Sequence, residues 1–181
     1  MKATYLGHAC YAIRCAKRLI LIDPLLTDVF QDGTAEVWPR RHIDLAAMPR
    51  PDVIVITHSH PGHLEVPSLA LLPRSVPVFY PADPTIELVL EELGFATRTV
   101  VGPGDEIELD GATITMTGST SGYPELGCLI QEGAASVWYL ADTAVGPRDL
   151  QRVAERAERV DLLLGNYPGY HHKFFTLLDV S

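Results

Sequence analysis

The first quarter of the chain consists of short apolar, β-rich runs bounded by turn residues, which is the pattern of strands. The runs are ATYLG (3–7), CYAIRC (10–15) and RLILID (18–23), with AKR as the turn between the last two. We therefore predict a β meander. From Pro24 to Pro51 this pattern of apolar runs breaks and prolines and charges are frequent, so we predict a long irregular loop over the surface.

The middle of the chain predicts a strand, helix, strand, helix alternation. DVIVIT is a continuous apolar run of strand length, typical of a strand covered on both faces. Asp83 and Pro84 supply an N-cap and a first-turn proline for the second helix, which Gly94 ends. The four elements are predicted at residues 52–57, 66–72, 76–80 and 83–94.

Strand-like runs then resume between glycine-containing turns, and they predict a second sheet that is mostly antiparallel. These runs are TRTVV (97–101), DEIEL (105–109), ATITMT (112–117), GCLIQE (127–132) and SVWYLAD (136–142). An amphipathic helix is predicted from Pro147 to Val160, with DLLLGN (161–166) after it as a buried strand. This order predicts a mixed α/β fold in which two sheets pack face to face with helices outside.

Composition narrows the class of protein. The chain has 181 residues and is 47% hydrophobic, which suits one domain spanning residues 1–181. Its formal charge of -9 argues against nucleic acid as a partner, because phosphates would meet a repelling surface. No apolar run is long enough to suggest a leader or a membrane span, so we expect a cytoplasmic protein with no membrane partner. Cys10, Cys15 and Cys128 lie in apolar segments without metal-type spacing and are expected to be buried reduced thiols.

Three histidines follow the buried strand within six positions, as His58, His60 and His63 in HSHPGH. A loop at a strand end is exposed and mobile unless something holds it. On extended backbone the first two side chains point the same way, and the tight Pro61-Gly62 turn can bring the third back toward them. Imidazoles are good ligands for zinc, iron or nickel, so we predict a metal site; three surface histidines in a turn are the alternative.

Carboxylates end two other apolar strands. Asp142 closes the strand of VWYLADTAV, and Asp23 closes that of LILIDPLL. Either acid alone could be a helix or turn cap. Together with the histidine loop they form the kind of constellation that binds a cation.

With these motifs the sequence resembles the metallo-β-lactamase fold superfamily, whose HxHxDH metal loop follows a strand. That loop stands here as residues 58–63, the acid of the family's IDP segment is matched by Asp23, and the metal-bridging acid of its GDT segment is matched by Asp142. Within the superfamily the chain is most similar to the branch that contains ascorbate-6-phosphate lactonase. The matching stretches are LGHACYAI, LIDPLL, LGFATRTVVGPGDEIEL and VDLLLGNYPG.

The resemblance implies an αββα sandwich with a site for one or two metal ions at one edge of the sheets. It implies that His58 and His60 bind the first metal, that His63 serves the second, and that Asp142 bridges them. It also implies hydrolysis by metal-activated water. The expected cofactor is a divalent metal, with zinc first and manganese or iron as alternatives.

The remaining site residues are also assigned by resemblance. Asp23 is expected behind the ligands rather than among them. His8 in GHAC is expected to reach the pocket as a catalytic residue with Asp142, and a hydrogen-bonded core histidine is the alternative. Substrate binding is expected of Tyr170, His171 and His172, and for these histidines two solvent-facing loop residues are an equally good interpretation.

Three features depart from the family pattern, and each removes a ligand. Gly62 stands where the family has an aspartate that binds the second metal and orients the water. The segment ITMTGSTSGYP offers only Ser and Thr hydroxyls where the family often has a His or Asp. The chain ends at Ser181, before the last helix and strand that the family would add, and that strand usually brings a final histidine.

These observations lead to one functional hypothesis and two alternatives. The first is a metal-dependent hydrolase of a small-molecule ester, lactone or phosphoester, similar to the lactonase. A non-catalytic protein with a degraded metal site is favoured by the lost ligands. An iron-dependent oxidoreductase on the same fold is compatible with a histidine-rich site that has one carboxylate. The sequence leaves open whether the chain forms a homo-oligomer.

Overall fold

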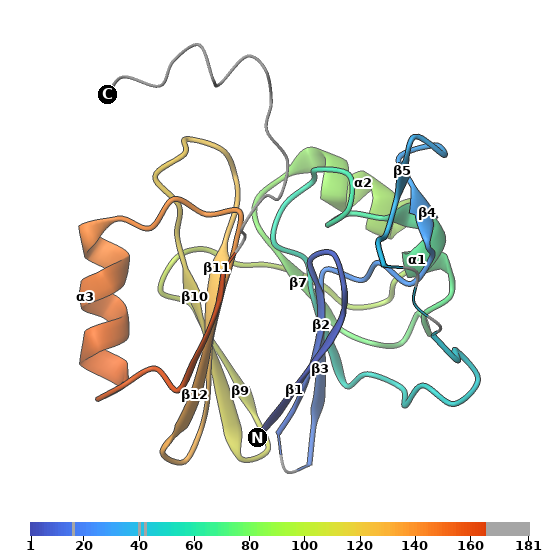
Figure 1. Cartoon of the computed structure of the whole chain (residues 1–181). Coiled ribbons are helices and arrows are strands. Elements are labelled where there is room, and N and C mark those ends of the chain that lie inside the picture. The colour runs from blue at the N-terminus through green and yellow to red at the C-terminus, as the bar shows by residue number, and fades with distance from the viewer. Residues whose placement is uncertain (16, 40, 42, 166–181) are drawn as a thin grey trace.

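The computed structural model describes residues 1–15, 17–39, 41 and 43–165, and in these residues two β-sheets pack face to face (Figure 1). The first sheet has the strand order β1-β2-β3-β6-β7-β8, and the second has the order β13-β12-β11-β10-β9. The strands of the first sheet are β1 (Lys2–Gly7), β2 (Cys10–Arg14), β3 (Leu19–Ile22), β6 (Val53–Val55), β7 (Val78–Tyr80) and β8 (Arg98–Val100). The strands of the second are β9 (Glu106–Leu109), β10 (Ala112–Thr117), β11 (Gly127–Glu132), β12 (Ala135–Ala141) and β13 (Leu162–Gly165).

Helices cover both outer faces of the sandwich. The helices α1 (Val66–Ala70) and α2 (Pro84–Glu92) lie on the side of the first sheet, and α3 (Pro147–Arg156) lies on the side of the second (Figure 1). The apolar contacts follow these layers, with one cluster between the two sheets and one under the helices on each side. The αββα class predicted from the sequence is confirmed.

Local sequence explains why α2 begins where it does. The side chain of Asp83 accepts a hydrogen bond from the backbone N–H of Thr85 at 2.8 Å, which satisfies a donor that the first turn leaves free. Pro84 follows at the first helical position, where its missing N–H costs nothing. On the inner face Ile86 and Leu90 are fully buried. The predicted start of this helix is confirmed.

Three expectations about strands were wrong. The TRTVV run was grouped with the second sheet, but β8 pairs in parallel with β7 in the first sheet. The short connection through α2 returns the chain beside the strand it has just left, and an apolar pattern alone does not specify a partner. The DLLLGN strand was expected to be buried, but β13 is a sheet edge in the described residues and leaves Leu163 56% exposed.

The third difference lies in the long loop. Its residues include a small antiparallel ribbon of β4 (Val29–Phe30) and β5 (Ala35–Glu36). Each strand of the ribbon has only two residues, too few to show a periodic pattern, so the ribbon could not be predicted. Its Phe30 is buried and joins the apolar cluster on the outer side of the first sheet.

Several strands of the first sheet end at the same edge of the sandwich. Since β3 is parallel to β6, and both β1 and β3 are antiparallel to β2, the strands β1, β3 and β6 all run in one direction. Their carboxyl ends therefore carry the β1–β2 turn, Asp23 and the histidine loop to one side.

Two further expectations concern the whole chain. Cys10, Cys15 and Cys128 are buried and free, as predicted, and burial raises the pKa of Cys10 to about 12. Among the described residues there is no helix with the length and apolar character needed to cross a membrane.

Candidate metal centre

The histidine loop begins where β6 ends. Thr57 and His58 are both fully buried, and the backbone N–H of Thr57 donates to Asp23 Oδ1 at 2.8 Å. This bond ties the end of β6 to the end of β3. This hydrogen bond therefore fixes the start of the loop without a bound ligand.

The hydrogen bonds around Thr57 determine which nitrogen of His58 carries the proton. The Thr57 hydroxyl donates its single proton to Asp23 Oδ2 at 2.7 Å. The hydroxyl also lies 3.0 Å from His58 Nδ1, so the proton between these two atoms belongs to the ring. His58 Nε2 is then an acceptor, and it is buried without a hydrogen-bond partner among the described residues.

The turn after His60 returns the chain as the sequence suggested. The backbone N–H of His63 donates to the carbonyl of His60 at 3.0 Å, with Gly62 at a φ of 99°. This conformation favours glycine. The ring of His58 has its centroid 4.0 Å from that of His63 and 4.6 Å from that of His60. The three imidazoles form one cluster.

Asp142 enters this cluster from the second sheet, at the end of β12. Its Oδ2 lies 3.8 Å from His58 Nε2 and 3.6 Å from His63 Nε2. These distances exceed hydrogen bonds, but two ligands of one zinc ion are separated by roughly 3 to 4 Å when each bond is about 2.0–2.1 Å. The atoms offered by His58, His60 and Asp142 all lie within 4.8 Å of one another.

Asp23 lies behind the cluster and orients His63. Its carboxylate is fully buried, and Oδ2 accepts hydrogen bonds at 2.8 Å from His63 Nδ1 and from the Tyr139 hydroxyl. A carboxylate on the far nitrogen of an imidazole fixes the ring and leaves Nε2 as the ligand atom. Tyr139 was not identified from the sequence, because nothing in an apolar strand shows that its hydroxyl will reach an acid 116 positions earlier.

Burial and the neighbouring charges shift the pKa values of the three histidines in different directions. Burial and the neighbouring His63 lower the pKa of His58 to about 4. Burial also acts to lower the pKa of His63, but Asp23 and Asp142 outweigh it and raise that pKa to about 9. Burial and His63 lower the pKa of His8. The two acids thus favour the protonated form of His63, whereas burial favours the neutral forms of His58 and His8.

The GSTSG segment positions Asp142 through its neighbours. Ser119 Oγ accepts the backbone N–H of Ala144 at 3.1 Å, and the Thr120 N–H donates to the Ala144 carbonyl at 2.8 Å. The Ser119 hydroxyl also donates to the buried Glu125. The serine and threonine side chains expected only as weak ligands therefore hold the segment that follows Asp142.

One aromatic residue beside the cluster was not identified from the sequence. The ring of Tyr123 stacks on His60 with a centroid separation of 4.8 Å, and Tyr123 is 46% exposed. A turn-rich segment gives no periodic signal for such a contact. Tyr123 therefore forms part of the solvent-facing rim of the site.

Three predicted substrate residues cannot be placed. Tyr170, His171 and His172 lie outside the described residues, so their contact with a substrate stays a prediction. His8 is placed, and its ring centroid lies 5.9 Å from that of His63.

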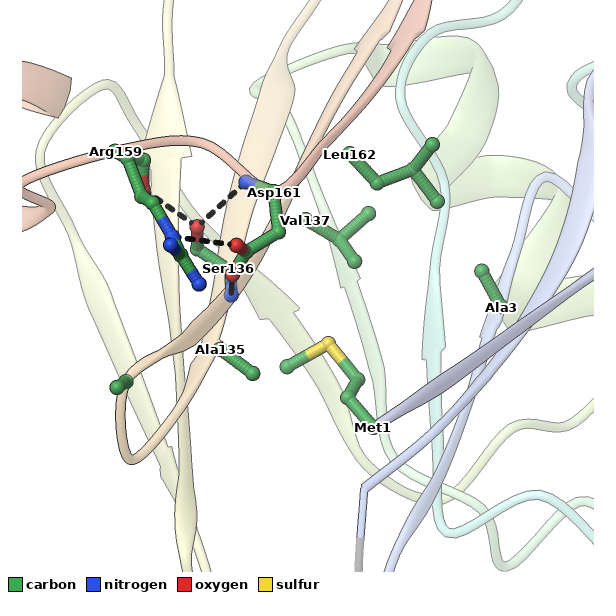
Figure 2. A pocket seen from close by; sticks show the side chains of 9 residues that line it. Met1, Ala3, Ala135, Ser136, Val137, Arg159, Asp161 and Leu162 are labelled. Atoms are coloured by element: carbon green, nitrogen blue, oxygen red, sulfur yellow. Dashed lines mark hydrogen bonds and ion pairs between the residues drawn. The ribbon is translucent and has the colours of Figure 1, made fainter.

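A cavity of about 470 Å³ lies away from this cluster, between β1 and the strands β12 and β13 (Figure 2). Met1, Ala3 and Leu162 line its apolar side, and a hydrogen-bonded group of Ser136, Arg159 and Asp161 lines the other. None of the cluster's histidines lines it. The candidate metal ligands therefore lie at the edge of the sheets and not in this cavity.

The residues present fit a metal ion. A buried imidazole nitrogen that is unprotonated and has no hydrogen-bond partner in the described part of the chain costs free energy unless something binds it. His60 and Asp142 offer further ligand atoms at compatible spacing, and Asp23 supplies the supporting hydrogen bond that metal-binding histidines usually have. Imidazole and carboxylate ligands suit zinc, iron or manganese.

Fold and site together define a protein of the metallo-β-lactamase type. The model of the beta-lactamase superfamily domain matches residues 18–174, and the chain belongs to this family.

Individual relatives agree with this family. A UPF0173 metal-dependent hydrolase of Thermoplasma acidophilum is 29% identical over 171 residues, which cover 85% of this chain and 69% of that protein. The crystal structure of CmlA, a diiron beta-hydroxylase from Streptomyces venezuelae, superposes with a TM-score of 0.69 at 25% identity and covers 89% of this chain. This chain spans only 33% of CmlA. The structure of a possible metal-dependent hydrolase from Veillonella parvula gives a TM-score of 0.68 at 18% identity, covers 93% of this chain and 74% of that one, and supports the fold.

Proposed function

We propose that the protein is a metal-dependent hydrolase that cleaves an ester, lactone or phosphoester bond of a small molecule. The observation that carries this proposal is the buried His58 Nε2, which has no hydrogen-bond partner in the described part of the chain and lies in one cluster with His60 and Asp142. The hydrolase name of the Thermoplasma relative supports the reaction class.

Each side chain has a task in this proposal. His58 and His60 would hold the ion, Asp142 would be shared between it and His63, and Asp23 would keep His63 in the orientation seen here. A bound divalent ion supplies a lowered pKa for water and a positive charge that polarises the scissile carbonyl or phosphoryl oxygen. Asp142 Oδ2, which faces both His58 and His63, can accept a proton from the attacking water.

The test is hydrolysis of p-nitrophenyl acetate, a γ-lactone and bis(p-nitrophenyl) phosphate by protein loaded with zinc or manganese. We expect at least one class to be cleaved, with activity lost on chelation and restored by metal. Asp142→Asn should abolish the activity, whereas Asp110→Asn, in the exposed turn where Asp110 pairs with Lys17, should leave it unchanged. Cleavage that is insensitive to chelator, or no cleavage by fully loaded protein, would contradict the proposal.

An iron-dependent oxidation is the second candidate, and the similarity to a diiron beta-hydroxylase favours it. Histidine and carboxylate ligands are also acceptable to iron. Iron in the purified protein, an optical absorption that zinc cannot give, and oxygen consumption in the presence of a reductant would support this candidate. Zinc-dependent hydrolysis without these signals would exclude it.

A further inference from the structure

The three imidazoles of the cluster are held in different ways. The Thr57 hydroxyl lies 3.0 Å from Nδ1 of His58. Asp23 lies 2.8 Å from Nδ1 of His63 and accepts its hydrogen bond. His60 is exposed, and no described residue makes a hydrogen bond to its ring. Metal-binding histidines usually donate their second ring nitrogen to a partner that sets the orientation of the ring, so the orientation of His60 depends on something else.

Contacts with two other rings are what His60 has instead. Its ring meets that of His58 at a centroid distance of 4.6 Å and an interplanar angle of 86°, and it stacks on that of Tyr123 at 4.8 Å and 30°. A metal ion draws electron density from the imidazole that binds it, and the π face of a tyrosine attracts positive charge within about 6 Å of the ring centroid. The stacking is therefore stronger when His60 binds a cation than when it does not.

The loop that carries Tyr123 is tied to the histidine loop through the backbone. The N–H of Leu126 donates to the carbonyl of Thr57 at 3.0 Å, at the end of β6. Within the loop, the N–H of Tyr123 donates to Ser121 Oγ at 3.2 Å, and its carbonyl accepts the N–H of Glu125 at 2.8 Å. These hydrogen bonds place the Tyr123 ring relative to the start of the histidine loop.

We propose that Tyr123 positions His60 for metal binding, in place of a hydrogen-bond partner. The aromatic face does this and the hydroxyl does not, because the contact is a stack of the two rings. Without the ring, His60 is free to turn away from the ion. The loop between β10 and β11 then acts on ligands of both sheets, since it also holds the segment that follows Asp142. This inference rests on the metal centre of the proposed function and not on hydrolysis.

Substitutions at position 123 separate the ring from the hydroxyl. Tyr123→Phe keeps the π face, and Tyr123→Leu keeps an apolar side chain without one. Tyr5→Leu is the matched control. Tyr5 is also exposed and its ring also packs on an aromatic ring, that of Tyr11 at 5.1 Å, but Tyr11 is not a candidate ligand.

The first readout is zinc affinity, measured by titration against a competing chelator. Tyr123→Leu should bind zinc roughly 2–12-fold more weakly than the wild type, which is the range expected for the loss of one aromatic pair. Tyr123→Phe should keep most of the affinity, and Tyr5→Leu should match the wild type. Wild-type affinity in Tyr123→Leu, or an equal loss in Tyr123→Phe, would overturn the proposal.

The second readout is a double-mutant cycle with His60→Ala, because a disturbed loop would also weaken zinc binding by displacing the segment that follows Asp142. If Tyr123 acts through His60, Tyr123→Leu should cause no further loss of affinity in the His60→Ala background. The same fold-loss in both backgrounds would show a merely structural role and would overturn the proposal. If His60→Ala binds no zinc, the comparison of Tyr123→Phe with Tyr123→Leu decides alone.

The failure of this inference is distinguishable from the failure of the proposed function. If Tyr123→Leu binds zinc as the wild type does and only raises KM for an ester, Tyr123 contacts the substrate and this inference fails alone. If wild-type protein binds no zinc, manganese or iron, the proposed function fails with it.

Discussion

Removing the Asp23 carboxylate should destabilise the protein even without metal. Its two oxygens accept hydrogen bonds from the Thr57 backbone, the Thr57 hydroxyl, Tyr139 and His63, and Asp23 is fully buried. In Asp23→Ala the Tyr139 hydroxyl can still donate to the Ala9 carbonyl 2.9 Å away, but the other donors lose their acceptor inside the protein.

The size of the effect follows from those donors. A buried donor left without a partner costs about 1–3 kcal/mol, and the losses of one network do not simply add. We expect a total of about 3–5 kcal/mol, close to the cost of breaking a buried charged pair. For a chain of this size that corresponds to a Tm lower by roughly 6–20 °C.

The assay is denaturant and thermal unfolding in chelator, so that bound metal does not contribute to the measured stability. Tyr139→Phe is the matched control, since it removes one donor and leaves the acid with the others, and it should cost about 0.5–1.5 kcal/mol. The reasoning is refuted if Asp23→Ala unfolds within about 2 °C of the wild type, or if it costs no more than Tyr139→Phe.

The other predictions concern the loop, the Asp142 segment and the metal. Thr57→Val removes the hydroxyl between Asp23 and His58 and should cost about 1–3 kcal/mol in denaturant unfolding, whereas Thr57→Ser should cost less than half as much. Ser119→Ala removes the hydroxyl that accepts from Ala144 and should weaken zinc binding about tenfold in a titration; an affinity equal to that of the wild type would exclude this positioning role. Protein held in free zinc at about 100 times its dissociation constant should be more stable than chelated protein by about 2.7 kcal/mol, seen as a higher Tm, and His58→Ala should show no such difference.

Much of the fold could be predicted because its signals are local. The apolar runs placed β6 and β12, and the Asp83 cap with Pro84 placed the start of α2. The same signals cannot assign a strand to a sheet, and so TRTVV was placed in the wrong one. The apolar run of β13 indicated burial, but burial also depends on a neighbouring element, and in the described residues β13 is an edge.

In the candidate site, too, contacts between residues close in the sequence could be predicted, whereas contacts between residues far apart in the sequence could not. The spacing of His58, His60 and His63 already indicated a metal loop, because the turn that gathers them lies in the loop itself. The hydrogen bond between Tyr139 and Asp23 joins residues 116 positions apart. Such contacts depend on the register of the strands in between, which no short pattern in the sequence specifies.

The most direct test of the metal centre is the metal content of the protein purified without added metal or chelator, measured by mass spectrometry beside His58→Ala. We expect near-stoichiometric zinc, manganese or iron in the wild type and its loss in the variant, with the variant still folded. Wild-type protein that stays free of metal after incubation with excess zinc or iron, or a His58→Ala variant that keeps the same metal content, would contradict it.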